Sequence, residues 1–328
     1  MIFLLQNTLI VMIPLLIVAL AGMFAERSGI INIALDGIMI FGAFAGALAA
    51  SILRNSPFFV DHNQLTFVIA LAVSALAGAL FSLLLSFSAI KFKADQTIGG
   101  TALNMLAPAI SLFFIKMLYH KDQLEMTSAR NSSGEFVNFG YAINNEDLGP
   151  VGRIFFDKAF ISTFIAIAVF ILLSVWIYKT KTGLRLRACG EHPQAAASVG
   201  INVNRMRYLG TTISGALAGY GGYAYVATVA NGNAKDEVAG MGFLALAIMI
   251  FGNWKPLGIL LGSFLFGLLK CVSVISNSSD VAFLKNLGLP SYFYNIIPYA
   301  AVLIVLAFTS KRSRAPKAEG IPYDKGMR

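Results

Sequence analysis

The sequence predicts an all-α, polytopic transmembrane helix bundle. Of its 328 residues, 57% are hydrophobic and only 12% are charged, whereas soluble domains carry about 25% charged residues. The mean hydropathy is +0.73. The apolar residues also fall into stretches that approach or exceed the roughly 20 residues needed to cross a bilayer. A soluble globule could not bury this much apolar surface, so we expect the chain to be embedded in a membrane.

The charged residues support the same class and argue against a nucleic-acid-binding protein. The formal net charge is +9, but most Lys and Arg residues lie in short links beside apolar segments. That arrangement follows the positive-inside rule of membrane proteins. The long polar link Tyr119–Asp157 carries six acids and three basic residues, which suits the outside face.

Nine spans are predicted, with the amino terminus outside and the carboxyl terminus in the cytosol. The first has no Lys or Arg before it and Arg27 directly after its end, which indicates an uncleaved helix with its positive flank inside. The predicted spans are Leu4–Ala25, Ile33–Leu53, Leu65–Ile90, Thr101–Leu118, Lys158–Tyr178, Tyr208–Val229, Ala239–Gly252, Pro256–Ile275 and Tyr292–Phe308.

The seventh segment, Ala239–Gly252, is short for a crossing. Its fourteen residues make roughly 21 Å of helix against a hydrocarbon core of about 30 Å, so a half-helix or a re-entrant segment is an alternative. The tail, residues 311–328, is basic and therefore expected in the cytosol, which requires an odd number of spans. The sequence thus predicts nine spans within a range of eight to ten, a transmembrane domain over residues 1–310 and a separate cytosolic tail.

Small residues are spaced for close helix packing in three spans. Each pair is four residues apart on one helix face, which lets backbones approach where lipid gives little hydrophobic drive between helices. The pairs are Gly42 and Gly46, Gly215 and Gly219, and Gly258 and Gly262. This pattern indicates a helix bundle and carries no information about function.

Catalytic and metal-binding patterns are missing from the sequence. It has no nucleophile motif, no phosphate-binding glycine loop and no histidine with a Glu or Cys partner at ligand spacing. We therefore expect no enzymatic activity and no metal in this chain. Ionisable residues in spans are functional candidates. Asp36 is expected near the cytosolic start of the second span, Lys116 near the outer end of the fourth and Lys270 near the outer end of the eighth. No carboxylate is expected at the midplane, so a proton- or sodium-driven carrier is disfavoured.

A polar stretch, Lys179–Arg207, divides the apolar sequence into two blocks. It has six basic residues against one acid, Glu191, which places it in the cytosol. Within it, Pro193 suits the first position of a helix and Gly200 a left-handed stop. Seven residues make a rod of roughly 10 Å, too short to span and marginal alone in water. We interpret it either as a docking helix or as an ordinary interfacial helix.

Four stretches together carry a recognisable pattern. They are AERSGIINIALDG at Ala25–Gly37, KADQTIGGTALNML at Lys93–Leu106, GEHPQAAASVGIN at Gly190–Asn202, and FGNWKPLG at Phe251–Gly258. These stretches resemble permease subunits of bacterial ABC importers in the ribose and branched-chain amino acid permease superfamily, specifically its nucleoside or simple-sugar branch. The tail Thr309–Arg328 and much of the link Tyr119–Asp157 have no counterpart in that resemblance.

The resemblance implies a multi-pass subunit of the bacterial inner membrane that works with three partners. These would be a second, homologous permease forming a heterodimer, a cytosolic ATPase with two nucleotide-binding modules, and an external substrate-binding lipoprotein. ATP and Mg would belong to the ATPase, and this chain would need no cofactor. The branch favours nucleosides or related simple sugars as the solute.

The resemblance also assigns roles to residues. The surface that couples to the ATPase would comprise Gly190, Glu191, His192, Pro193, Ala195, Ala196 and Gly200. Flanking charges would come from Arg185 and Arg187. The alternative is that Pro193 and Gly200 only delimit a helix and that the arginines only fix topology.

Three polar residues within or beside spans are candidates for the translocation pathway: Asn32, Thr101 and Asn104. A buried amide must find partners in lipid, and a hydrated path or a helix-to-helix hydrogen bond would serve equally well. The rival to the importer is a stand-alone secondary transporter or facilitator for a small polar solute.

Overall fold

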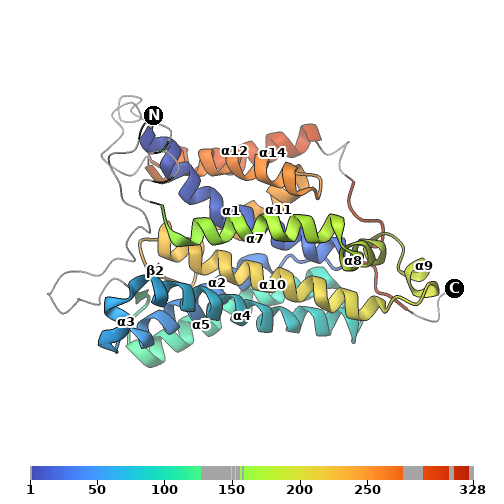
Figure 1. Ribbon diagram of the computed structural model, residues 1–328, viewed down its shortest axis with the longest axis horizontal. Coiled ribbons are helices and arrows are strands. Elements are labelled where there is room, and N and C mark those ends of the chain that lie inside the picture. The colour runs from blue at the N-terminus through green and yellow to red at the C-terminus, as the bar shows by residue number, and fades with distance from the viewer. Residues whose placement is uncertain are drawn as a thin grey trace.

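The computed structural model describes residues 2–126, 159–275, 291–309 and 314–324, together with 149, 152 and 156. These residues are helical apart from connections and a short antiparallel ribbon in which β1 (Leu124–Glu125) pairs with β2 (Asn233–Ala234). The helices, shown in Figure 1, are α1 (Ile2–Arg27), α2 (Leu35–Leu53), α3 (Pro57–Asp61), α4 (Asn63–Ile90), α5 (Gln96–Tyr119), α7 (Ile161–Lys179), α8 (Lys181–Glu191), α9 (Pro193–Ser198), α10 (Val203–Thr228), α11 (Met241–Phe251), α12 (Pro256–Ile275) and α14 (Ser291–Thr309).

Each predicted span coincides with a helix in the described part of the chain, so the all-α bundle is confirmed. In these residues, α1, α2, α4, α5 and α7 are long and apolar enough to cross a bilayer by length and composition. The count of nine crossings and the sides of the termini stay predictions. Most of the polar link Tyr119–Asp157 and the basic residues Lys311 and Arg312 lie outside the described residues.

The polar stretch Lys179–Arg207 is mostly helical, which corrects the expectation of a loop holding one short helix. Thr180 begins α8, because its Oγ1 accepts a hydrogen bond from the Gly183 backbone nitrogen at 3.1 Å. A buried stripe at Gly183, Leu186 and Gly190 holds α8 against the bundle. The helix α9 begins at Pro193 as predicted, and Gly200 has the predicted left-handed backbone, with φ +83°.

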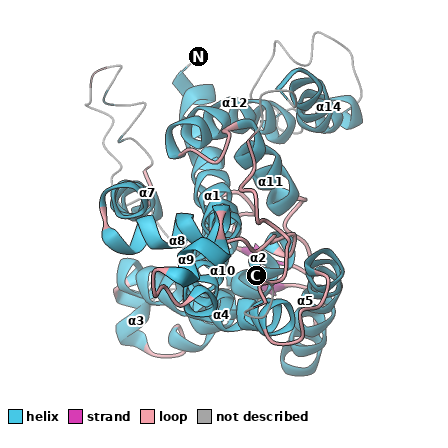
Figure 2. Cartoon of the chain, turned by 90° about the vertical axis from the view of Figure 1, so that its right-hand side faces the viewer, coloured by secondary structure: helices cyan, strands magenta, loops and turns pink. Residues whose placement is uncertain are grey.

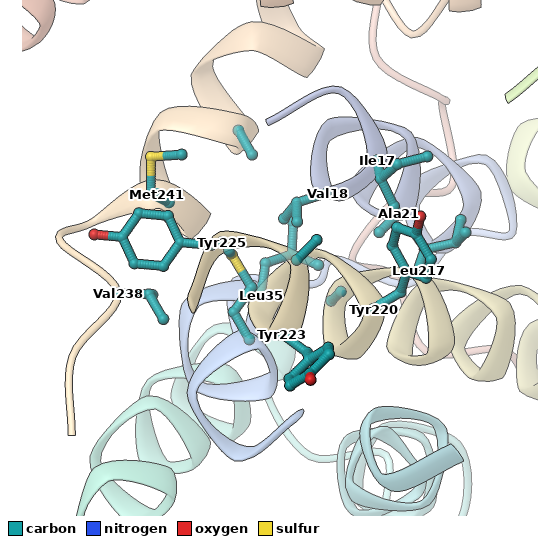
Figure 3. Packing of buried hydrophobic residues seen from close by; sticks show 14 of the residues in the cluster. Ile17, Val18, Ala21, Leu35, Leu217, Tyr220, Tyr223, Tyr225, Val238 and Met241 are labelled. Carbon is teal, nitrogen blue, oxygen red and sulfur yellow. The ribbon is translucent and has the colours of Figure 1, made fainter. Parts of the chain in front are cut away.

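The core of the bundle is built around α10, which packs against α1, α2 and α4. Figure 3 shows α10 side chains such as Tyr223 among apolar residues of the neighbouring helices. Glycines let these backbones touch: a Cβ on Gly42 would lie 2.4 Å from Gly219 Cα, and one on Gly78 would lie 2.3 Å from Gly215 O. Two of the predicted small-residue faces, on α2 and α10, are therefore occupied by helix contacts within the chain.

Replacing Gly219 with Ala should destabilise the protein. The new Cβ would lie 2.2 Å from Ser74 O, so α4 and α10 would have to separate. Overpacking of this kind costs about 1–3 kcal/mol, and thermal unfolding of the purified protein should show it. The control is Gly99→Ala on α5, where the nearest atom is Ser88 Oγ at 3.3 Å and helix propensity favours alanine. Equal unfolding temperatures for the two variants would contradict this packing.

The seventh predicted span is a half-helix preceded by non-helical chain. Ala239 and Gly240 both have positive φ, +48° and +65°, and α11 follows with 11 residues, about 16 Å of helix. Its first turn is tied to α2, since Asp36 Oδ1 accepts a hydrogen bond from Gly242 N at 2.8 Å. The half-helix alternative is the one observed, and any crossing here includes the non-helical residues.

Residues 314–324 return to the end of the bundle where α8 and α9 lie, as Figures 1 and 2 show. The segment is non-helical, and its backbone hydrogen-bonds with the preceding domain. Ala318, at 6% exposed, is buried there. This part of the predicted tail is thus packed on the domain.

Candidate functional site

The exposed side of α9 is the surface predicted for docking. His192, Gln194, Ala195, Ser198 and Val199 are exposed, and the apolar Val199 is 75% exposed. Ala196 faces the other way: it is 4% exposed and packs with Cys189 and Val203. Of the predicted coupling residues, His192, Ala195 and Gly200 are exposed, Glu191 is half-buried, and Gly190, Pro193 and Ala196 are buried.

The buried side of α9 rests on the end of α8. Burial raises the pKa of Cys189 to about 11, so this thiol packs as a neutral group. Arg187 stacks over the Tyr178 ring, with its guanidinium carbon 4.8 Å from the ring centroid. Because a six-residue helix is marginal alone, the packing of Ala196 with Cys189 and Val203 is what fixes α9 in one orientation.

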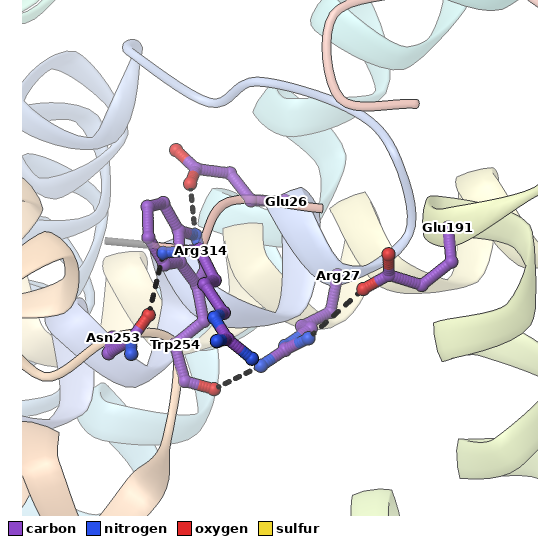
Figure 4. Close-up of polar contacts among 6 residues, drawn as sticks. All are labelled: Glu26, Arg27, Glu191, Asn253, Trp254 and Arg314. Carbon is purple, nitrogen blue, oxygen red and sulfur yellow. Dashed lines mark hydrogen bonds and ion pairs between the residues drawn. The ribbon is translucent and has the colours of Figure 1, made fainter. Parts of the chain in front are cut away.

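Arg27, at the end of α1, connects α8 to the turn between α11 and α12 (Figure 4). Its Nη1 lies 3.5 Å from Glu191 Oε1, and its Nη2 donates to Trp254 O at 3.1 Å. The neighbouring Glu26 accepts a hydrogen bond from Trp254 Nε1. A movement of α9 would therefore reach α1 and the α11–α12 turn through a few short contacts.

The α11–α12 turn is strained and buried. Asn253 and Trp254 both have φ +53°, a backbone region that costs non-glycine residues energy and recurs at functional sites. Trp254 is 3% exposed, and Asn253 Oδ1 accepts a hydrogen bond from Arg314 N at 2.9 Å. The surrounding contacts hold this turn in its unusual conformation.

The break between α1 and α2 contains Asn32 and contacts Asn104, two of the three pathway candidates. Asn104 Oδ1 accepts from Gly37 N at 2.7 Å and its Nδ2 donates to Ile33 O at 2.9 Å. Asn32 Nδ2 donates to Ser214 Oγ on α10 at 2.9 Å. These geometries fit the alternative of hydrogen bonds between segments. Side chains of α5 and α10 thus bond to Gly37 N, Ile33 O and Asn32 Nδ2 where the helix is interrupted, whereas the buried Asn32 Oδ1 has no hydrogen-bond partner among the residues that the structure describes.

Thr101 is not part of this network. Its Oγ1 donates to Thr97 O at 3.0 Å and Ile98 O at 2.9 Å within α5, and the residue is exposed. Gln96, which the sequence did not single out, does belong to it, because its Oε1 accepts from Ile31 N at 2.7 Å. The N-cap Asp95 immediately before it was the available sequence signal that α5 begins there.

Asp36 lies in the first turn of α2, at the start of the second predicted span as expected. It contacts Gly242 at the first turn of α11, about 16 Å along that helix from the turn held by Arg27. The side of the membrane on which this end of α2 lies stays a prediction. Close by, Lys270 Nζ and Tyr299 Oη donate to Ala239 O at 3.3 and 2.9 Å. These polar groups secure the start of the half-helix.

Replacing Asn104 with Leu should cost about 2 kcal/mol of unfolding free energy, because Gly37 N and Ile33 O would each lose a hydrogen bond. Thermal unfolding followed by intrinsic fluorescence would measure the loss. Thr101→Val is the matched control on the same helix, since its hydroxyl bonds only with its own helix backbone. If Thr101→Val destabilises as much as Asn104→Leu, the break does not depend on Asn104.

The contact of residues 314–324 with the domain should weaken as pH rises. Burial raises the pKa of Glu319 to about 7, although Glu26 and Arg27 oppose that rise. The packed segment then binds more protons than a detached one, so raising pH through 7 favours detachment. A cysteine at Ala318 should be labelled faster at pH 8 than at pH 6, relative to one at the exposed Lys317. Glu319→Gln should remove the difference, and a ratio independent of pH in the parent would contradict it.

Comparisons with known proteins match the chain to permease components of transport systems. Residues 4–306 match the family described as branched-chain amino acid transport system, permease component. The chain is 38% identical over 321 residues to the guanosine ABC transporter permease protein NupQ of Bacillus subtilis (strain 168), covering 98% of this chain and 96% of the relative.

Two proteins of Lactococcus lactis subsp. cremoris (strain MG1363) are also similar. The nucleoside ABC transporter permease protein NupC is 36% identical over 319 residues, covering 97% of this chain and 96% of the relative. The nucleoside ABC transporter permease protein NupB is 24% identical over 325 residues, covering 96% and 82%. No solved structure matches the chain.

Proposed function

Since the chain belongs to the family of permease components of branched-chain amino acid transport systems, we propose that it is the nucleoside-translocating permease of an ATP-driven importer. It is a multi-pass membrane protein and a transporter subunit. The observation that carries the ATP-driven mechanism is the exposed face of α9, which is rigidly mounted on α8 and connected through Arg27 to the α11–α12 turn. Such a helix is suited to receive a push from a cytosolic partner.

The proposed partners follow from this mechanism. A cytosolic ATPase with two nucleotide-binding modules would bind ATP and Mg and dock on Ala195 and Val199, which are exposed on α9. An external binding protein would deliver the solute. The second subunit would be a related permease, an idea supported by the similarity of this chain to both NupC and NupB of one organism.

The hydrogen bonding of Asp36 does not favour the stand-alone carrier. Its Oδ1 accepts from Gly242 N, so the carboxylate stabilises the amino-terminal end of α11, where negative charge is favoured. That is a structural role for the one feature that would otherwise suggest proton-coupled transport.

The solute class is tested in cells that lack this chain and in cells that regain it. Uptake of radiolabelled guanosine and uridine should disappear on deletion and return on complementation, while uptake of ribose should be unchanged. The nucleoside assignment rests on relatives named for guanosine and nucleoside transport. Loss of ribose uptake with nucleoside uptake intact would overturn it.

A further inference from the structure

The segment 314–324, here called the tail strap, contacts the α11–α12 turn, the end of α8, the α1–α2 break and the α4–α5 link. It lies beyond residues 4–306, the part that matches the family. At its start, Arg314 N donates to Asn253 Oδ1 at 2.9 Å, on the α11–α12 turn. At its end, Asp324 pairs with Lys93, between α4 and α5, at 2.6 Å. The strap therefore spans the elements that would have to move together.

The middle of the tail strap joins α8 to the α1–α2 break. Ala318 N donates to Gly190 O at 2.9 Å, and Gly320 N donates to Gly29 O at 3.3 Å. Packing at this junction is tight, since a Cβ on Gly29 would lie 3.0 Å from Arg207 Nη2 and 3.4 Å from Ala318 O. Two donors separated by one residue thus hold two different elements together.

Near its end, the strap also supports α9. Tyr323 packs against the buried cluster of Cys189, Ala196 and Val203 that carries this helix. Gly320 has φ +74°, and a Cβ there would lie 2.8 Å from Ile31 Cδ1. A residue with a Cβ at 320 is strained by this positive φ, most of all a β-branched one, and would also displace the Ile31 side chain.

We propose that the tail strap is a positioning element of transport, which ties α9 to the α1–α2 break so that movement of α9 is transmitted to the bundle. This rests on the proposed ATP-driven function. Arg27 links the end of α8 to the α11–α12 turn, and the strap adds a link to the segment held by Asn32 and Asn104. Without the strap, the ATPase would continue to hydrolyse ATP, but hydrolysis would no longer move the segment between α1 and α2.

The experiment uses the full complex in proteoliposomes and measures solute taken up per ATP hydrolysed. Gly320→Val should lower this ratio by about tenfold, within the range of ordinary coupling energies, with hydrolysis changed less than twofold. Tyr323→Ala, near the chain end and half-buried, should lower it as well without affecting assembly. Ile321→Ala is the control, because that side chain is 55% exposed.

The possible results separate this proposal from the function on which it rests. An unchanged ratio in Tyr323→Ala, or losses of uptake that only follow the amount of assembled complex, would overturn the strap's role. Uptake by the parent complex without ATP would instead overturn the ATP-driven function.

Discussion

Replacing Ala195 with Arg should abolish co-purification of the ATPase with the permease while leaving the fold intact. Ala195 is exposed on α9, and the larger charged side chain would occupy the surface proposed for docking. Transport should fall to background, because no ATPase would be bound. Affinity purification of the tagged complex, with thermal unfolding of the variant chain, would show both effects.

Ala196→Arg provides the contrast one residue along. Ala196 is 4% exposed and packs with Cys189 and Val203, so an arginine there should displace α9 from its support and lower the unfolding temperature. Its effect on docking would be indirect. If Ala195→Arg retains the ATPase and full transport, the exposed face of α9 is not the docking surface.

Arg27→Met should reduce transport by about tenfold or more while the complex still assembles. The ion pair with Glu191 is half-exposed and by itself is worth less than about 1 kcal/mol. The larger consequence is that Trp254 O loses its donor in a strained, buried turn. The α8 end and the α11–α12 turn would then move independently.

Uptake and ATPase activity of the reconstituted Arg27→Met complex would measure this loss of coupling. The control is Lys181→Met, which removes an equal charge from an exposed position at the start of α8. Equal activity of the two variants would mean that Arg27 contributes only to topology.

The sequence was sufficient to predict the bundle and the limits of α9. Span-length apolar segments and basic links are strong signals, because a chain segment in lipid has few alternatives to forming a helix. Pro193 and Gly200 marked α9 because each suits a specific backbone position. The same stretch concealed α8, whose buried stripe at Gly183, Leu186 and Gly190 is diluted by basic residues on its exposed side.

The partners of individual side chains could not be predicted. Whether Ala195 or Ala196 faces outward depends on the position of Cys189 and Val203, which comes from tertiary packing. Asn104 was found as a polar group in a span, but its bonding to the α1–α2 break depends on how α2 and α5 meet. The sequence predicts a separate basic tail because charge is visible in sequence, whereas the hydrogen bonds of Ala318 and Gly320 are not.

ATP dependence of nucleoside uptake tests the central claim most directly. Proteoliposomes containing this chain, its related permease and the ATPase would be supplied with the binding protein and radiolabelled guanosine, with Mg-ATP on the side that carries α9. We expect uptake with ATP, none with a non-hydrolysable analogue, and none with this chain alone. Uptake by the purified chain alone, without ATP or partners, would contradict the account.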